Sequence, residues 1–337
     1  MLVFSFVVIM FGCELFTNGI EWFGRKKRLG EGAVGSILAA VATAMPETLI
    51  SLVAIAFHRG KQHGTDVAIG AILGAPFLLS TLAFLVIAIS VFVYTARGRR
   101  THEMPVNSVV LSRDLANFFI VYLLACSLAF LPEQWKTAGL RVCAAVVLVV
   151  IYVAYVRAHF AEQGKVEATD ELRPLRFDAR RQDPRLSRVI VQCLASLVMV
   201  IGGAHVFVEE ITFIAATAGV SAATLSLIIA PIVSELPEKF NSIIWVRDGK
   251  DTLALGNVTG AMVFQSSITP AVGILFTPWS FAGRPGLTTS VIVALLSAAF
   301  VLSCLKVMRR LSPYVLLVGA PLYLVFVLDV FFFRWSG

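Results

Sequence analysis

Long apolar blocks separated by short polar loops make up most of the chain. Most blocks are about 20 residues long, the length that an α-helix needs to cross ~30 Å of hydrocarbon. They are continuous, whereas the strands of a membrane β-barrel alternate polar and apolar residues. We therefore expect an all-α integral membrane protein with ten transmembrane helices. The ten predicted spans lie near residues 2–22, 32–57, 67–94, 114–131, 137–157, 188–218, 221–246, 252–276, 287–306 and 312–333.

One polar stretch is much longer than the other loops. It covers residues 158–187 and separates the first five predicted spans from the last five. We interpret residues 158–187 as a linker on the cytoplasmic side, because no motif in it indicates a regulatory role. The chain then divides into two five-helix halves, residues 1–157 and 188–337.

Composition and charge agree with a membrane protein. Hydrophobic residues make up 58% of the chain and charged residues 15%, against about 25% in soluble proteins. The net charge of +7 does not indicate nucleic-acid binding, because the basic residues lie in short loops. Of the 28 Lys and Arg residues, 21 follow odd-numbered spans or lie in the linker, which predicts a cytoplasmic linker and both termini outside. The first block has no basic segment before it, so we expect a first transmembrane helix rather than a cleaved signal. The compact size and the absence of a targeting segment favour a prokaryotic plasma membrane.

Two segments of the chain repeat one another. AAVATAMPETLIS, residues 39–51, aligns with IAPIVSELPEKFNS, residues 229–242. The matched pairs are Thr43 with Ser234, Pro46 with Pro237, Glu47 with Glu238, and Ser51 with Ser242. Each half holds an odd number of spans, so the second copy enters the membrane from the opposite side. Inverted repeats of this kind are typical of secondary transporters, which bind substrate near the bilayer midplane.

The repeated residues predict a cation site. Proline inside a span removes one backbone donor, so we expect interrupted helices with freed carbonyls around Thr43 and Ser234. A glutamate at membrane depth is costly unless it is paired, hydrated or bound to a cation. Carboxylates, hydroxyls and carbonyls are hard oxygen ligands, which suit Ca²⁺ or Na⁺. The candidate ligands from the repeat are Glu47, Glu238, Thr43, Ser234, Ser51 and Ser242.

A pair of glycines follows each repeat segment. Gly70 and Gly74 align with Gly256 and Gly260. This small-xxx-small spacing predicts close approach of a neighbouring helix.

At these residues the sequence resembles the sodium/calcium exchanger family, whose two repeats carry a Gly-Ser/Thr-Ser-x-Pro-Glu motif and a span beginning Gly-Asn-x-x-Gly-Ser-Asn. The resemblance covers residues 30–80 and 219–270 closely. It implies a ten-helix antiporter that couples Ca²⁺ movement to Na⁺ or H⁺. Glu47 and Glu238 would be the central ligands, with Thr43 and Ser234 lending oxygens, and Asn257 matches the motif Asn.

The chain departs from the family motif at several positions that would line Na⁺ sites. Alanine, proline, methionine or glutamate stands where the motif has Ser or Asn, at Ala44, Glu235, Ala71, Ala75, Pro76, Ala261 and Met262. These replacements put sodium coupling in doubt.

Glu235 and Lys239 are additional charged residues of the second repeat. Their i, i+4 spacing suits a self-neutralising ion pair. The alternatives are that Glu235 binds a proton, or that Lys239 occupies the position of a second cation. Glu235 and Asn257 complete the candidate ligands, and Gln265 either adds an amide oxygen or packs between helices.

Other intramembrane polar residues have open roles. Glu14, Asn18 and Glu21 on the first span, with the Glu209–Glu210 pair on the sixth, could line an ion path or lie at interfaces. We expect Asp114, at the start of the fourth span, to lie at the membrane interface.

Competing functions are an enzyme and a transport-inactive homologue. No His-Glu-x-x-His, Gly-x-Ser-x-Gly or glycine-rich nucleotide motif occurs, so we expect no enzyme and no cofactor. A homologue that has lost the ion site and acts as a scaffold stays possible because motif oxygens are missing. The expected partners are the lipid bilayer, Ca²⁺, and Na⁺ or H⁺, without nucleic acid; the sequence does not specify an oligomer.

Overall fold

The computed structural model of the chain describes residues 1–26, 45–57, 62–163, 173–284 and 286–330. Within these ranges the side chains at 45–47, 62–63, 159–163, 233–234 and 236–241 lie outside the description. The described residues form an α-helical bundle, and their only β contact is an isolated bridge between Met104 and Leu311.

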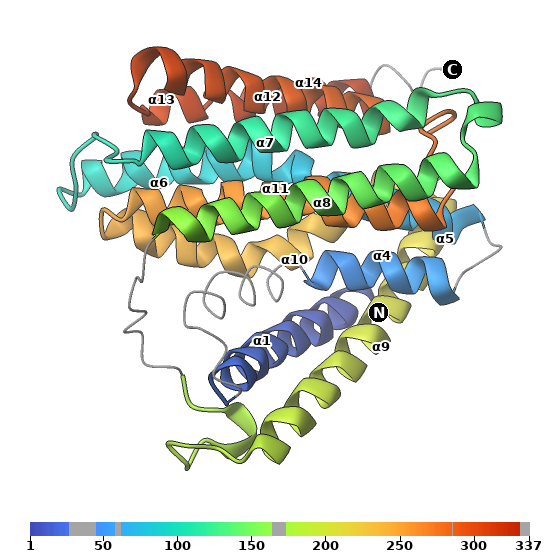
Figure 1. Cartoon of the computed structure of the whole chain (residues 1–337), viewed down its shortest axis with the longest axis horizontal. Helices are drawn as coiled ribbons and strands as arrows, with labels where there is room; N and C mark the ends of the chain where they lie inside the picture. Colours follow the sequence, from blue (N-terminus) through green and yellow to red (C-terminus); the bar gives the residue numbers. More distant parts are fainter. Residues whose placement is uncertain (27–44, 58–61, 164–172, 285, 331–337) are drawn as a thin grey trace.

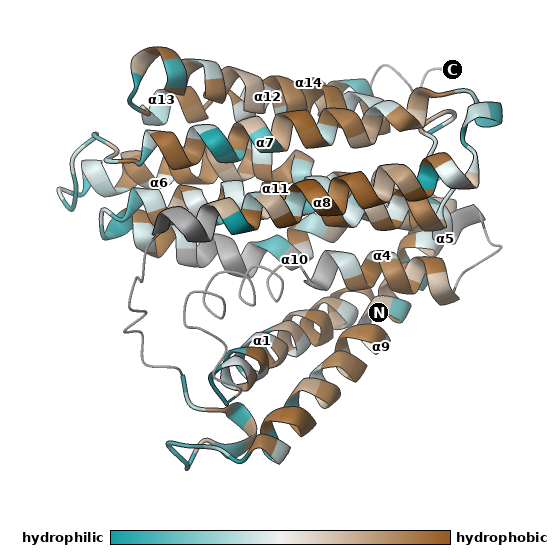
Figure 2. Ribbon diagram, in the orientation of Figure 1, coloured by the Kyte–Doolittle hydropathy of each residue, from teal (hydrophilic) through white to brown (hydrophobic). Residues whose placement is uncertain are grey.

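The helices follow the predicted spans closely. Their bounds are α1 Leu2–Lys26, α4 Met45–Phe57, α5 Gln62–Leu78, η2 Leu79–Ala83, α6 Phe84–Ala96, α7 Ser108–Ser127, α8 Ala138–Gln163, α9 Leu186–Ala218, α10 Ala222–Arg247, α11 Asp251–Phe276, α12 Leu287–Met308, α13 Pro313–Leu316 and α14 Gly319–Leu328. Figure 1 shows most of them lying side by side, and Figure 2 shows apolar helices with polar loops at the ends of the bundle.

Seven described helical stretches are long and apolar enough to cross a membrane. Shorter apolar helices at Thr48–Phe57, Ala222–Ile232 and Pro313–Leu328 fall in the other three predicted spans. The all-α multi-pass architecture is thus confirmed, whereas the count of ten spans and the division into two five-helix repeats stay predictions.

The third predicted span is one continuous helical rod formed by α5, η2 and α6. Pro76 removes one backbone donor within α5, and the π-helical turn η2 follows directly. Hydroxyls satisfy carbonyls around this turn: Ser80 Oγ donates to Pro76 O at 2.8 Å, and Thr81 Oγ1 donates to Phe77 O at 2.6 Å. Local bonds of this kind let an irregular turn exist at membrane depth without exposed polar backbone.

Helices α5 and α10 pack backbone to backbone through the first glycine pair. A methyl group in place of the Gly70 hydrogen would lie 2.2 Å from Ala223 O, and one at Gly74 would lie 2.2 Å from Leu227 O. Pro231 deprives Leu227 O of its usual helical donor, so the Gly74 Cα can approach that carbonyl. The prediction of close approach is confirmed for Gly70 and Gly74.

The second glycine pair behaves differently. No described atom lies within 4 Å of the position that a methyl group would take at Gly256 or Gly260. Within the described part of the chain, close packing at this pair is therefore not observed.

Helices α1 and α9 pack along one another, and α9 also packs against α4, α5 and α10. The two helices lie at the bottom of the view in Figure 1. The end of the linker holds them together: Trp22 Nε1 donates to Arg173 O at 2.9 Å, and Gln192 Oε1 accepts from Phe177 N at 2.9 Å. Gln192 Nε2 also donates to Asn18 Oδ1 at 3.0 Å. The described end of the linker is therefore a structural strap across α1 and α9.

Replacing Gly74 with Ala tests the α5–α10 contact. We expect this variant to lower stability by about 1–3 kcal/mol, because the new methyl group would overlap Leu227 O and Pro231 Cγ. Gly202→Ala is the matched control, since Gly202 is an exposed α9 residue with no described atom within 4 Å. Thermal unfolding in detergent measures both, and equal melting temperatures for Gly74→Ala and the wild type would contradict the packing argument.

Candidate cation site

The two motif glutamates lie on α4 and α10, but their side chains are not described. Glu47 is in the first turn of described α4, and Glu238 lies in the second half of α10. The side chain of Ser234 is likewise outside the described residues, and Thr43 lies outside them altogether. That two carboxylates meet at the midplane therefore stays a prediction.

The serines one turn after each glutamate are described and are alike. Ser51 is 1% exposed on α4, and Ser242 is 0% exposed on α10. Neither Oγ atom has a hydrogen-bond partner among the described residues. Serines in membrane helices commonly donate to the carbonyl one turn earlier, as Ser80 does here. Each repeat segment therefore has, at the same aligned position, a buried hydroxyl without a described hydrogen-bond partner.

Glu235 is the best-described acidic residue of the candidate site. It is 1% exposed and lies near the middle of α10. Gln265, near the middle of α11 and also 1% exposed, donates from Nε2 to Glu235 Oε1 at 2.7 Å. The Oε1 atom of Gln265 has no hydrogen-bond partner among the described residues. A hydrogen bond therefore joins two spans deep inside the bundle.

This contact bears on two alternatives raised by the sequence. Gln265 contributes its amide nitrogen to Glu235, which is a role that spacing alone did not assign. The side chain of Lys239 lies outside the description, so the proposed Glu235–Lys239 ion pair remains untested.

The expectation of an interrupted helix is wrong for α10. The helix runs without a break from Ala222 to Arg247 through Pro231 and Pro237. Each proline still leaves the carbonyl four residues earlier without its helical donor, so freed carbonyls need no break in the helix. The helix stays unbroken because the loss of one backbone hydrogen bond costs less free energy than unwinding a whole turn in hydrocarbon.

Asn257 is half-buried on α11, about two turns before Gln265. It shares this half-buried surface with Gly256 and Gly260. The structure places it on the helix that carries Gln265, but shows no contact between Asn257 and Glu235.

A second buried carboxylate was missed by the sequence reasoning. Asp114 is 1% exposed on α7, accepting from Tyr155 Oη of α8 and from Thr259 Oγ1 of α11, each at 2.8 Å. Asp114 is therefore buried between three helices. Its expected position at the membrane interface stays a prediction. The available signal was Thr259, a hydroxyl between the two α11 glycines that suited a partner on another span.

Three of the acidic residues of α1 and α9 have partners outside the candidate site. Glu14 pairs with Arg176 of the linker, Glu209 lies 3.5 Å from His205, and Glu210 lies 3.6 Å from the N-terminal amine. Asn18 Oδ1 accepts hydrogen bonds from Arg176 N of the strap and from Gln192 Nε2. These contacts give no support to an ion path along the two helices.

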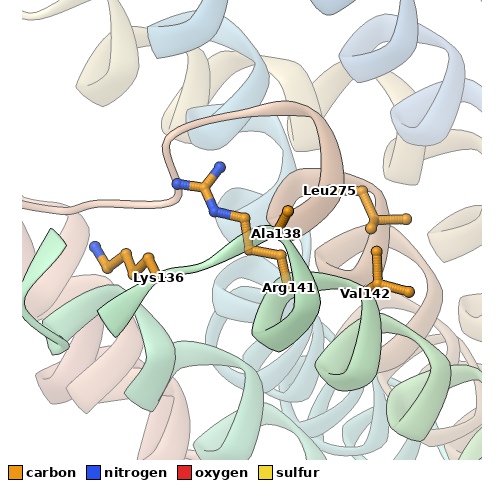
Figure 3. Close-up of a pocket in the computed structure, with 5 residues that line it drawn as sticks. All are labelled: Lys136, Ala138, Arg141, Val142 and Leu275. Atoms are coloured by element: carbon orange, nitrogen blue, oxygen red, sulfur yellow. The ribbon is translucent and has the colours of Figure 1, made fainter. Parts of the chain in front are cut away.

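Figure 3 shows a pocket at the start of α8 and the end of α11, lined by Lys136, Ala138, Arg141, Val142 and Leu275. Its charged groups are both cationic. Lys136 Nζ donates to Ala129 O, Glu133 Oε1 and Trp279 O, and Arg141 Nη1 donates to Thr277 O. This pocket therefore does not suit a cation.

No group of three or more His, Cys, Asp or Glu residues that could hold a metal ion occurs among the described residues. This finding does not test the predicted ligands Glu47 and Glu238, because their side chains are not described.

Comparison with known proteins identifies the family. The family described as "Sodium/calcium exchanger protein" matches residues 1–160 and 188–332. Among curated proteins, "Inner membrane protein YrbG" of Escherichia coli K12 is 25% identical over 271 residues, which is 80% of this chain and 77% of the relative. "Putative antiporter CaxA" of Alkalimonas amylolytica is 24% identical over 321 residues, which is 93% of each chain.

Solved structures share the fold. The H⁺/Ca²⁺ exchanger CAX superposes with a TM-score of 0.73 at 18% identity, covering 98% of this chain and 81% of that one. The sodium-calcium exchanger NCX_Mj superposes with a TM-score of 0.57 at 18% identity, covering 98% of this chain and 97% of that one. The family match over both halves, with the multi-pass helical fold, establishes that the chain belongs to the sodium/calcium exchanger family and is a membrane transporter rather than an enzyme.

Proposed function

We propose that the protein is a secondary active antiporter that moves Ca²⁺ across the membrane by alternating access in exchange for H⁺. The observation that carries the choice of counter-ion is the buried hydrogen bond between Glu235 and Gln265 in the middle of α10 and α11. In this proposal Glu47 and Glu238 bind the cation near the midplane.

The donor set suits Ca²⁺. This ion takes six to eight oxygen ligands, commonly including carboxylates. Glu47 and Glu238 would supply carboxylates, with Ser51 and Ser242 one turn away on the same helices. An unsatisfied buried hydroxyl costs about 1–3 kcal/mol, so two of them at matching positions are better explained by a ligand than by packing.

Glu235 supports proton coupling because its partner can serve both protonation states. The Gln265 amide donates to the ionised carboxylate through Nε2. After the amide turns over, Oε1 can accept from the protonated carboxyl group. The pair can therefore gain and lose a proton without losing its interhelical hydrogen bond.

Sodium is the alternative counter-ion, and loss of transport is the alternative outcome. The replaced motif residues, including Ala44, Ala71 and Met262, remove side-chain oxygens. Their loss argues against sodium coupling and is the reason that loss of transport is kept as an alternative. The relatives described as an antiporter and an H⁺/Ca²⁺ exchanger support exchange as the class of activity.

Flux into proteoliposomes tests the counter-ion. We expect an outward proton gradient to drive Ca²⁺ uptake, and Glu235→Gln to reduce that uptake at least about tenfold, equivalent to ~1.4 kcal/mol, because the amide cannot carry the proton. Exchange of labelled Ca²⁺ for unlabelled Ca²⁺ needs no counter-ion and should survive in this variant. Glu103→Gln, an exposed loop residue, is the matched control. Uptake that follows a Na⁺ gradient and ignores pH would refute proton coupling.

Replacing Glu47 or Glu238 with Gln tests the cation site itself. We expect each variant to lose both net Ca²⁺ uptake and Ca²⁺/Ca²⁺ exchange by at least about tenfold, since a neutral amide replaces a charged ligand. Normal exchange in both variants would remove these glutamates from the site. A wild-type protein inactive with either gradient would favour the scaffold alternative.

A further inference from the structure

A buried ion pair ties the loop after α6 to the start of α11. Arg100 Nη1 lies 2.6 Å from Asp251 Oδ1, and Arg100 Nη2 lies 2.7 Å from Asp251 Oδ2. The two side chains are only 5% and 0% exposed. Two parallel hydrogen bonds between a guanidinium and a carboxylate fix orientation as well as distance.

The same arginine also binds the end of α10. Arg100 Nη1 donates to Val246 O at 2.7 Å, and Nη2 donates to Glu103 O at 2.9 Å. Asp251 is the first residue of α11, so its negative charge lies at the positive end of that helix, while Arg100 faces the negative end of α10. Arg100 thereby closes the α10–α11 hairpin.

A second ion pair ties the loop after α11 to the start of α5. Arg284 Nε donates to Asp66 Oδ1 at 2.6 Å, and Arg284 Nη1 donates to Ser280 O at 2.5 Å. Both side chains are 14% exposed. Asp66 lies in the first part of α5, before Gly70 and Gly74.

The two pairs are reciprocal. Asp66 and Arg100 lie near opposite ends of the α5–α6 rod, and Asp251 and Arg284 lie near opposite ends of α11. Asp66 lies in the first part of α5, and Asp251 is the first residue of α11. The arginine that follows α11 binds Asp66, and the arginine that follows the α5–α6 rod binds Asp251. The α5–α6 rod and α11 therefore run antiparallel, and the two ion pairs lie at opposite ends of the bundle.

Both ion pairs contact helices that carry residues of the candidate site or pack against such a helix. Arg100 contacts the end of α10 and the start of α11, the helices that carry Glu235 and Gln265. At the other end, Asp66 belongs to α5, whose glycines pack against α10. Each pair thus constrains, from one end, the spacing of helices that meet at the midplane.

We propose that Asp66, Arg100, Asp251 and Arg284 are positioning residues that form two matched interhelical pins, one at each membrane face. Each pin holds the glycine-bearing helices together at its face and sets the affinity for the transported cation on that face. The inference rests on the proposed antiport function for its transport readout.

Burial separates these pairs from the ordinary surface pairs of the chain. Lys26 Nζ lies 2.5 Å from Asp183 Oδ1, but the Asp183 side chain is 81% exposed. Exposed pairs contribute little to stability, whereas breaking a buried pair leaves an uncompensated charge. Asp183→Asn is therefore the matched control for Asp66→Asn and Asp251→Asn.

Sided transport measurements test the positioning role. In vesicles of each orientation, Asp251→Asn should raise the half-saturating Ca²⁺ concentration severalfold on the predicted cytoplasmic face and leave the outer face close to wild type. Asp66→Asn should do the reverse, and Asp183→Asn should change neither. Unchanged affinities, or equal changes on both faces in both variants, would overturn the proposal.

Thermal unfolding in detergent tests, without a transport assay, whether the two ion pairs stabilise the fold. Asp251→Asn and Arg100→Asp should each lower the melting temperature, and the exchanged double variant Arg100→Asp/Asp251→Arg should recover part of the loss. Recovery is expected to be partial because arginine is unfavourable at the start of a helix. Wild-type melting of the single variants would refute the pins.

The two measurements separate the hypotheses. Wild-type protein that carries no Ca²⁺ under either gradient would refute the proposed function, and the positioning role with it. The positioning role alone would be refuted if the single variants melt below the wild type and the double variant recovers part of the loss, while the Ca²⁺ affinities on the two faces stay unchanged or change equally.

Discussion

Hydrocarbon does not hydrogen-bond, so every polar group inside the membrane needs a partner within the protein. This constraint explains the polar contacts of the bundle. Hydroxyls such as Ser80 bond back to carbonyls of their own helix. Asp114 accepts from two hydroxyls on two other spans, and Glu235 accepts from Gln265. Ser51 and Ser242 are buried hydroxyls without a described hydrogen-bond partner, and the proposed cation site would supply one.

The aligned repeats are chemically and mechanically unequal. The first glycine pair brings α5 onto the backbone of α10, whereas the second has no described neighbour at the same distance. The second repeat also carries the extra carboxylate Glu235 and the amide Asn257. Antiparallel spans and reciprocal ion pairs fit a symmetric frame. The hydrogen bond between Glu235 and Gln265 joins α10 and α11.

Sequence reasoning located the helices because twenty apolar residues are both the signal for a span and its physical requirement. Close packing at Gly70 was predictable for a similar reason, since only a missing side chain permits that approach. The unbroken course of α10 was not predicted, because the cost of one lost hydrogen bond must be compared with the cost of unwinding in lipid. The burial of Asp114 was not predicted because its partners lie on α8 and α11, and the sequence around α7 does not show which helices pack against it.

The sequence by itself determined the membrane class, the approximate spans, the repeated Pro-Glu segments and the family resemblance. These properties depend on local composition and spacing, which the chain carries directly. Only the tertiary structure decided that Gln265 is the partner of Glu235, and that Arg100 and Arg284 bind aspartates 151 and 218 residues away in the chain. Such pairings depend on which helices lie side by side and on how deeply they are buried, and neither is written in the local pattern of any one span.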